Sequence, residues 1–88
     1  MDSTTELPAL DLDDLERFVR ARFARDGKLL VWVPQQHPSQ GRQLRRLRAR
    51  LLADDRLQVG LFIGNGRRYM TVTRQGELVT AWAGWPTD

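Results

Sequence analysis

The 88-residue sequence contains no cysteine, which excludes disulfides and any zinc or iron–sulfur site that depends on thiolate ligands. It has no apolar run near the roughly 20 residues that a membrane-spanning helix needs. Its acidic first residues also lack the cationic and apolar regions of a secretory signal peptide. We therefore expect a soluble, cytoplasmic protein with no membrane partner, no metal and no other cofactor.

Acidic residues are scarce in the middle of the chain. Residues 28–76 carry ten basic side chains and two acidic ones, whereas residues 1–27 carry seven acids and four bases. This uneven distribution indicates an anionic partner more strongly than the net charge of +3 does. Nearly all of the bases are arginine, which favours bidentate and stacked contacts.

The length allows a single domain, because a second independent core would need a longer chain. The domain is expected to span residues 11–85. A flexible N-terminal arm, residues 1–10, precedes it, since that segment has no periodicity and contains Pro8, and a short tail, residues 86–88, follows it. A domain of this size buries a modest share of its surface, so a homodimer interface would add stability.

Hydrophobic spacing predicts two helices. From Leu12 to Phe23 the apolar residues recur on one helical face, Asp11 is suited to cap the N-terminus, and Gly27 is suited to end the helix. A second helix, from about Ser39 or Arg42 to Ala53, carries a stripe of leucines with arginines on the other side.

Apolar runs, alternation and two short turns predict four strands. The run that ends at Val33 is unbroken and is followed by Pro34, which is typical of a strand covered on both faces. Asn65-Gly66 predicts a type I′ hairpin, and Gln75-Gly76 a second two-residue turn. The predicted strands are residues 29–33, 56–64, 67–74 and 77–83.

These elements predict an α+β fold, a two-layer α/β sandwich with the order α-β-α-β-β-β. Both helices are expected to lie on one face of a four-stranded mixed sheet. The crossover through the second helix should be right-handed, so that strands 29–33 and 56–64 run parallel. Sheets of this kind serve many functions, so the fold alone discriminates little between them.

The two turns fix the strand register and so predict an aromatic row on the face away from the core. The first turn places Phe62 opposite Tyr69, and the second places Tyr69 opposite Trp82. This row has three interpretations: a stabilising ladder or covered face, a protein interface such as a homodimer seam, or a platform on which bases stack.

The arginines of the second helix form a second candidate surface. Within three or four positions of them the only acidic partner is Asp54, four residues after Arg50. A helix with a purely structural role usually interleaves the two signs. The alternative is a solvated face without a ligand. The residues predicted to bind nucleic acid or another anion are Arg42, Arg45, Arg46, Arg50, Arg67 and Arg68.

No catalytic residue and no metal ligand are predicted. His37 is the single histidine and would need Ser39 and a carboxylate such as Glu16 or Glu77 to approach it in space. A histidine in a proline-containing loop is more often a turn residue. The adjacent pair Asp54-Asp55 lacks further ligands.

The leading hypothesis is a small non-enzymatic protein that binds nucleic acid through its arginine-rich helix. The alternative is a small protein-binding inhibitor or adaptor, of the antitoxin-like or phage-encoded kind, that acts through the aromatic face or an exposed strand edge. The third hypothesis is a small ribonuclease toxin that uses His37 and arginines.

Overall fold

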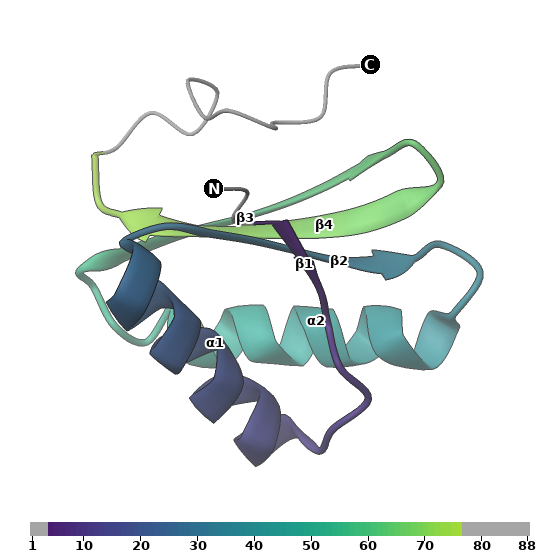
Figure 1. Cartoon of the computed structure of the whole chain (residues 1–88), viewed down its shortest axis with the longest axis horizontal. Coiled ribbons are helices and arrows are strands. Elements are labelled where there is room, and N and C mark those ends of the chain that lie inside the picture. The colour runs from purple at the N-terminus through teal and green to yellow at the C-terminus, as the bar shows by residue number, and fades with distance from the viewer. Residues whose placement is uncertain (1–3, 77–88) are drawn as a thin grey trace.

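The computed structural model describes residues 4–76 and shows a four-stranded sheet with both helices on one face (Figure 1). The sheet is mixed and has the strand order β1-β2-β4-β3. This confirms the predicted α+β class and the predicted order of elements from the first helix to the hairpin. The elements are β1 (Thr4–Glu6), α1 (Leu12–Asp26), β2 (Leu29–Pro34), α2 (Pro38–Leu51), β3 (Leu57–Gly64) and β4 (Arg67–Arg74).

Helix α1 begins and ends where its sequence predicts. The carboxylate of Asp11 accepts a hydrogen bond of 2.9 Å from the amide of Asp14, which satisfies one of the free N–H groups of the first turn. At the other end Gly27 has a φ of 76°, and its amide donates to the carbonyl of Phe23 at 2.7 Å. Glycine suits this left-handed position because a side chain would be strained there.

The main core lies between the two helices and the sheet. Both helices turn their apolar stripes toward the sheet, and every second residue of the central strands points back at them. The side chains at the centre of this layer are almost fully enclosed. Its enclosed side chains are Leu7, Leu15, Val19, Leu29, Val31, Val33, Leu44, Leu47, Leu51, Met70 and Val72.

The β3–β4 hairpin has the predicted register. Asn65 and Gly66 both have positive φ angles, 52° and 71°, as a type I′ turn requires. Phe62 consequently lies opposite Tyr69. The turn alone therefore determines which side chains of the two strands share a face.

Strand β2 occupies the second edge of β4. It pairs antiparallel with β4 and places Trp32 opposite Tyr69. The predicted strand 77–83, with Trp82, lies outside the described residues, and the edge of β4 that it was expected to take is filled by β2. Since β2 and β3 are both antiparallel to β4, they run in the same direction, as predicted for the crossover through α2.

Thr4–Glu6 form a strand where a loose arm over residues 1–10 was expected. Strand β1 pairs in parallel with β2. Directly after it, the amide of Leu7 donates to the carbonyl of Trp32 at 2.9 Å, and the Leu7 side chain is only 1% exposed. The sheet therefore includes residues that precede the predicted domain start at Asp11. A three-residue strand has no periodicity of its own, and it exists only because β2 offers it an edge.

Leu7 provides a test of this placement. Replacing Leu7 with alanine should lower the free energy of unfolding by about 2–5 kcal/mol, because the substitution leaves a cavity in the main core. Leu10→Ala is the matched control, since Leu10 is 43% exposed, and it should change the stability by no more than about 0.5 kcal/mol. Urea denaturation measures both values. Equally small effects in the two variants would contradict the position of Leu7.

Candidate functional site

Helix α2 exposes all five of its arginines to solvent because its leucine stripe is turned toward the sheet, and three of them lie together on the side opposite that stripe. Arg42, Arg45 and Arg46 are exposed, and within residues 4–76 none of them forms an ion pair. We call these three residues the α2 arginine face. Helix α2 contains no acidic residue, so its own sequence offers these guanidinium groups no partner.

Helix α1, in contrast, pairs its own charges. Arg17 lies 2.8 Å from a carboxylate oxygen of Asp14, and Arg20 lies 2.9 Å from one of Glu16. Both pairs join neighbouring turns of the helix, with the acid nearer the N-terminus, which also suits the helix dipole. With Arg25 beside Asp26, three of the four basic residues of α1 are thus matched locally, whereas those of the α2 arginine face are not.

Arg50 differs from the other arginines of α2 because it connects the two helices. Its Nη1 atom contacts the carboxylate of Asp13 and lies 3.4 Å from that of Glu16. The hydrogen bond from Arg50 lowers the pKa of Asp13, and the same bond raises the pKa of Arg50. Arg50 is therefore engaged with α1 and does not belong to the α2 arginine face.

Arg67 and Arg68 are adjacent in β4 and so point to opposite faces of the sheet. The guanidinium group of Arg67 stacks over the ring of Trp32 at 3.8 Å, on the face away from the helices. Arg68 lies on the helix side of the sheet and packs closely against Gly41 of α2. A Cβ atom at position 41 would be only 3.2 Å from the Nη1 atom of Arg68. The six predicted arginines thus do not form one surface: Arg50 is engaged with α1, and Arg67 lies on the face away from the helices.

The aromatic row is real but differs in composition from the one predicted. Phe62 and Tyr69 stack with their ring centres 4.9 Å apart and their planes within 9° of parallel. On the other side of Tyr69 the paired residue is Trp32. Tyr69 is only 3% exposed, whereas Trp32 and Phe62 are partly buried against it. The centre of the row is therefore closed to a ligand.

Trp32 is the residue that sequence reasoning missed. It lies in an unbroken apolar run, which indicates a buried strand but does not indicate which faces its residues take. Its partner strand follows only after α2 and β3, so no short turn fixes the pairing. The apolar run itself was the one signal for an inner position of this strand. A strand that is covered on both faces usually lies inside a sheet and not at its edge.

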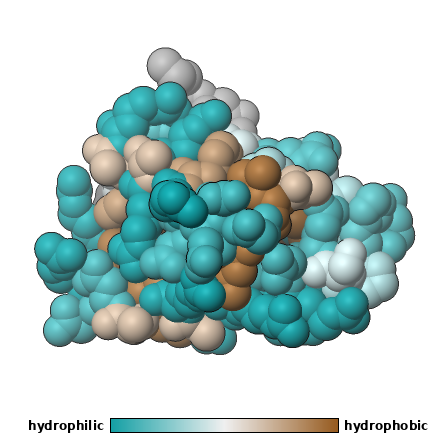
Figure 2. Space-filling model, turned by 90° about the horizontal axis from the view of Figure 1, so that it is seen from below, coloured by the Kyte–Doolittle hydropathy of each residue, from teal (hydrophilic) through white to brown (hydrophobic). Residues whose placement is uncertain are grey.

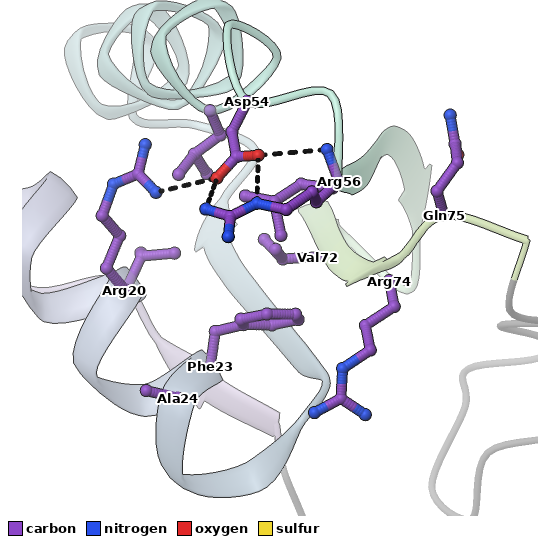
Figure 3. Close-up of a pocket in the computed structure, with 11 residues that line it drawn as sticks. Arg20, Phe23, Ala24, Asp54, Arg56, Val72, Arg74 and Gln75 are labelled. Carbon is purple, nitrogen blue, oxygen red and sulfur yellow. Dashed lines mark hydrogen bonds and ion pairs between the residues drawn. The ribbon is translucent and has the colours of Figure 1, made fainter.

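A cavity of about 560 Å³ opens where the C-terminal ends of α1 and α2 meet the sheet. Its walls include Phe23 and Val72, and charged residues stand at its rim (Figure 3). The surface on the helix side of the molecule is mostly hydrophilic, with hydrophobic residues exposed in places (Figure 2). The cavity therefore combines an apolar interior with a charged rim.

Asp54 connects two basic residues of the rim, Arg56 and Arg20. Its carboxylate accepts hydrogen bonds of 3.0 Å from the backbone amide, the Nε atom and the Nη2 atom of Arg56, and Arg20 approaches to 3.8 Å (Figure 3). These bonds from Arg56 lower the pKa of Asp54 to about 2. The carboxylate is thus fully charged near neutral pH and saturated with donors, which suits a structural role better than proton transfer.

Within residues 4–76, the side chain of His37 forms no hydrogen bond or ion pair with an acidic residue. It is exposed at the start of α2, and its side chain makes no capping hydrogen bond. Glu16, one of its two proposed partners, is bonded to Arg20 and Arg50, and Glu77 lies outside the described residues. Between Thr4 and Gly76 there is also no group of three or more histidine, aspartate or glutamate side chains placed to hold a metal ion.

Comparison with models of known families, with curated proteins and with solved structures gives no match for this chain. Neither of the helices in residues 4–76 is long and apolar enough to cross a membrane. The geometry of the described surfaces is therefore the basis for any functional proposal.

The bonds to Asp54 predict a specific titration. Its lowered pKa means that the pairing stabilises the fold above the ordinary value of 3.8, and that this contribution is lost as the pH falls through about 2. In Arg56→Gln the pKa of Asp54, followed by NMR of its carboxyl carbon, should rise toward the ordinary value. Arg74→Gln, at the same rim, is the matched control and should leave it unchanged. An unaltered pKa in Arg56→Gln would disprove the assignment.

Proposed function

We propose that this protein is a small non-enzymatic binding protein that contacts the phosphate backbone of nucleic acid through the α2 arginine face. The observation that carries the proposal is that Arg42, Arg45 and Arg46 are exposed on a helix without acids and form no ion pair with any residue of the described segment 4–76. Guanidinium groups form short, often bidentate hydrogen bonds with phosphate oxygens, and these bonds are stronger than those between neutral groups.

The spacing of the three arginines suits neighbouring phosphates. Arg42 and Arg46 are four residues apart, which separates them by about 6 Å along the helix axis, and Arg45 lies beside Arg46. Three guanidinium groups within about one helical turn can neutralise about three phosphates. Backbone contacts carry no sequence information, so we expect binding that is independent of sequence and strongly weakened by salt.

Base stacking is not part of this proposal. Tyr69 is too enclosed to receive a base, and Arg67 already covers one ring of the aromatic row, that of Trp32. Arg50 is likewise held by acids of α1. The proposal therefore rests on phosphate contacts from α2 alone.

A protein-binding inhibitor or adaptor is the second candidate function. The observation that favours it is the position of β3, which pairs with β4 on one side and has no described strand on the other. An open strand edge can accept a strand from another protein through backbone hydrogen bonds. The aromatic face is less suited to docking because Tyr69 is enclosed.

Salt dependence tests the nucleic-acid proposal. Binding of the full chain to random single- and double-stranded oligonucleotides is measured by fluorescence anisotropy at about 50 and about 200 mM salt. With three phosphates neutralised, the affinity for duplex should fall roughly 40-fold between the two conditions. Absence of binding at the lower salt concentration would overturn the proposal.

A matched pair of variants locates the surface. Arg45→Glu/Arg46→Glu should abolish the low-salt binding, because it replaces two attractive contacts with repulsive ones. Arg17→Glu/Arg25→Glu makes the same change in net charge on α1, where both residues already have acidic neighbours, and it should retain most of the binding. Equal losses in both variants would indicate a general charge effect and not a contact through α2.

A further inference from the structure

The two outer strands of the described sheet differ in length and chemistry. Strand β1 has three residues and ends in Glu6, whereas β3 has eight residues, LQVGLFIG, with neither a charge nor a proline. Proteins commonly protect outer strands by shortness, charged residues, proline or bulges, because an unprotected edge pairs readily with another chain. Strand β1 has such protection, and β3 does not.

The peptide groups that face the open edge can be assigned. In the β3–β4 ladder the amide of Gln75 donates to the carbonyl of Arg56 at 3.0 Å. Hydrogen-bonded pairs alternate with non-bonded pairs along an antiparallel ladder. The even-numbered residues of β3 therefore bond to β4, whereas Val59, Leu61 and Ile63 direct their N–H and C=O groups away from it.

The side chains of these odd-numbered residues lie on the helix side of the sheet, since Leu61 is opposite the buried Met70. Helix α2 does not cover them fully. Leu61 is 37% exposed and Ile63 is 55% exposed. The open edge therefore offers free backbone groups and an apolar surface at the same positions.

The charge beside this edge is positive. A cavity of about 330 Å³ separates α2 from this end of β3, and its lining includes Arg45 and Arg68. Arg45 has no ion-pair partner within the described part of the chain, and the buried Nε atom of Arg68 has no hydrogen-bond partner there. An acidic group placed here would meet two guanidinium groups.

We propose that the edge of β3 from Val59 to Ile63 binds an extended segment of a partner protein as an additional strand. The segment carries an apolar residue and an acidic residue two positions apart, so that both face the helix side. The apolar side chain packs against Leu61 and Ile63, and the carboxylate pairs with Arg45. This inference deepens the second candidate function and does not require nucleic-acid binding, although Arg45 belongs to both surfaces.

Charge favours such a partner over a second copy of the chain. Neither β3 nor α2 contains an acidic residue, so a copy paired through β3 would bring no carboxylate from these elements to Arg45. It would instead add the arginines of its own α2 to the same side of the joined sheet. An acidic segment removes this repulsion.

A random peptide library displayed on phage, panned against the full-length chain, tests the proposal. The enriched peptides should carry an apolar and an acidic residue two positions apart. On addition of one such synthetic peptide, the amides of Val59, Leu61 and Ile63 should become protected from hydrogen exchange. Peptides without this spacing, or protection elsewhere only, would overturn the proposal.

Three variants complete the test. Ile63→Lys should weaken the peptide at least about tenfold, because a charge on an outer strand opposes pairing. Leu52→Lys is the matched control, since Leu52 is 43% exposed at the end of α2, and it should bind as the wild type does. Arg45→Glu should prefer the peptide whose acid is replaced by lysine. Equal binding by all three would refute the site.

Other occupants of the edge give different results. A dimer by light scattering that Ile63→Lys makes monomeric would assign the edge to a second copy. Strong exchange protection of the same amides in the free monomer would assign it to the chain's own residues 77–88. Either result overturns the proposal. Oligonucleotide binding, measured in parallel, should be unchanged in Ile63→Lys, so that failure of this inference is distinguishable from failure of the nucleic-acid proposal.

Discussion

The position of β4 between β2 and β3 is the constraint on which the rest of the fold depends. Both of its edges are paired, and its successive side chains point to opposite faces of the sheet, so they enter two separate layers. Met70 and Val72 enter the core beneath the helices, whereas Tyr69 and Thr71 are buried on the opposite face. The chain passes from β2 through α2, on one face of the sheet, to β3. Because β4 lies between β2 and β3, β3 is an outer strand of the described sheet.

Local sequence signals predicted those features whose physical cause lies within a few residues. Asp11 caps the start of α1 and Gly27 caps its end, each through a hydrogen bond to the adjacent turn of the helix. Asn65-Gly66 likewise fixes the register of the hairpin. The pairing of β2 with β4 depends instead on residues far apart in the chain, and the unbroken run in β2 gave no preference for a face. Strand β1 is too short to produce a pattern, so its place in the sheet was not predicted.

The candidate surface was predicted in composition but not in its partners. The sequence identifies an arginine-rich helix, and spacing along that helix shows that acids are missing from it. It does not show that Asp13 and Glu16, from the other helix, engage Arg50. Nor does it show that Arg67 covers Trp32, since that contact requires the non-local pairing of β2 with β4. Each arginine's role depends on the tertiary contacts that it makes.

Strand β4, one of the two inner strands of the sheet, is also the last described strand in the chain. During synthesis from the N-terminus, β2 has only the three residues of β1 to pair with until residues 67–74 emerge. The β3–β4 hairpin forms through local contacts and can fold as a unit, whereas its docking onto β2 closes a long loop that contains α2. Completion of the sheet therefore waits until β4 has been synthesised, and before that point the apolar strand β2 has an unpaired edge that is prone to aggregation.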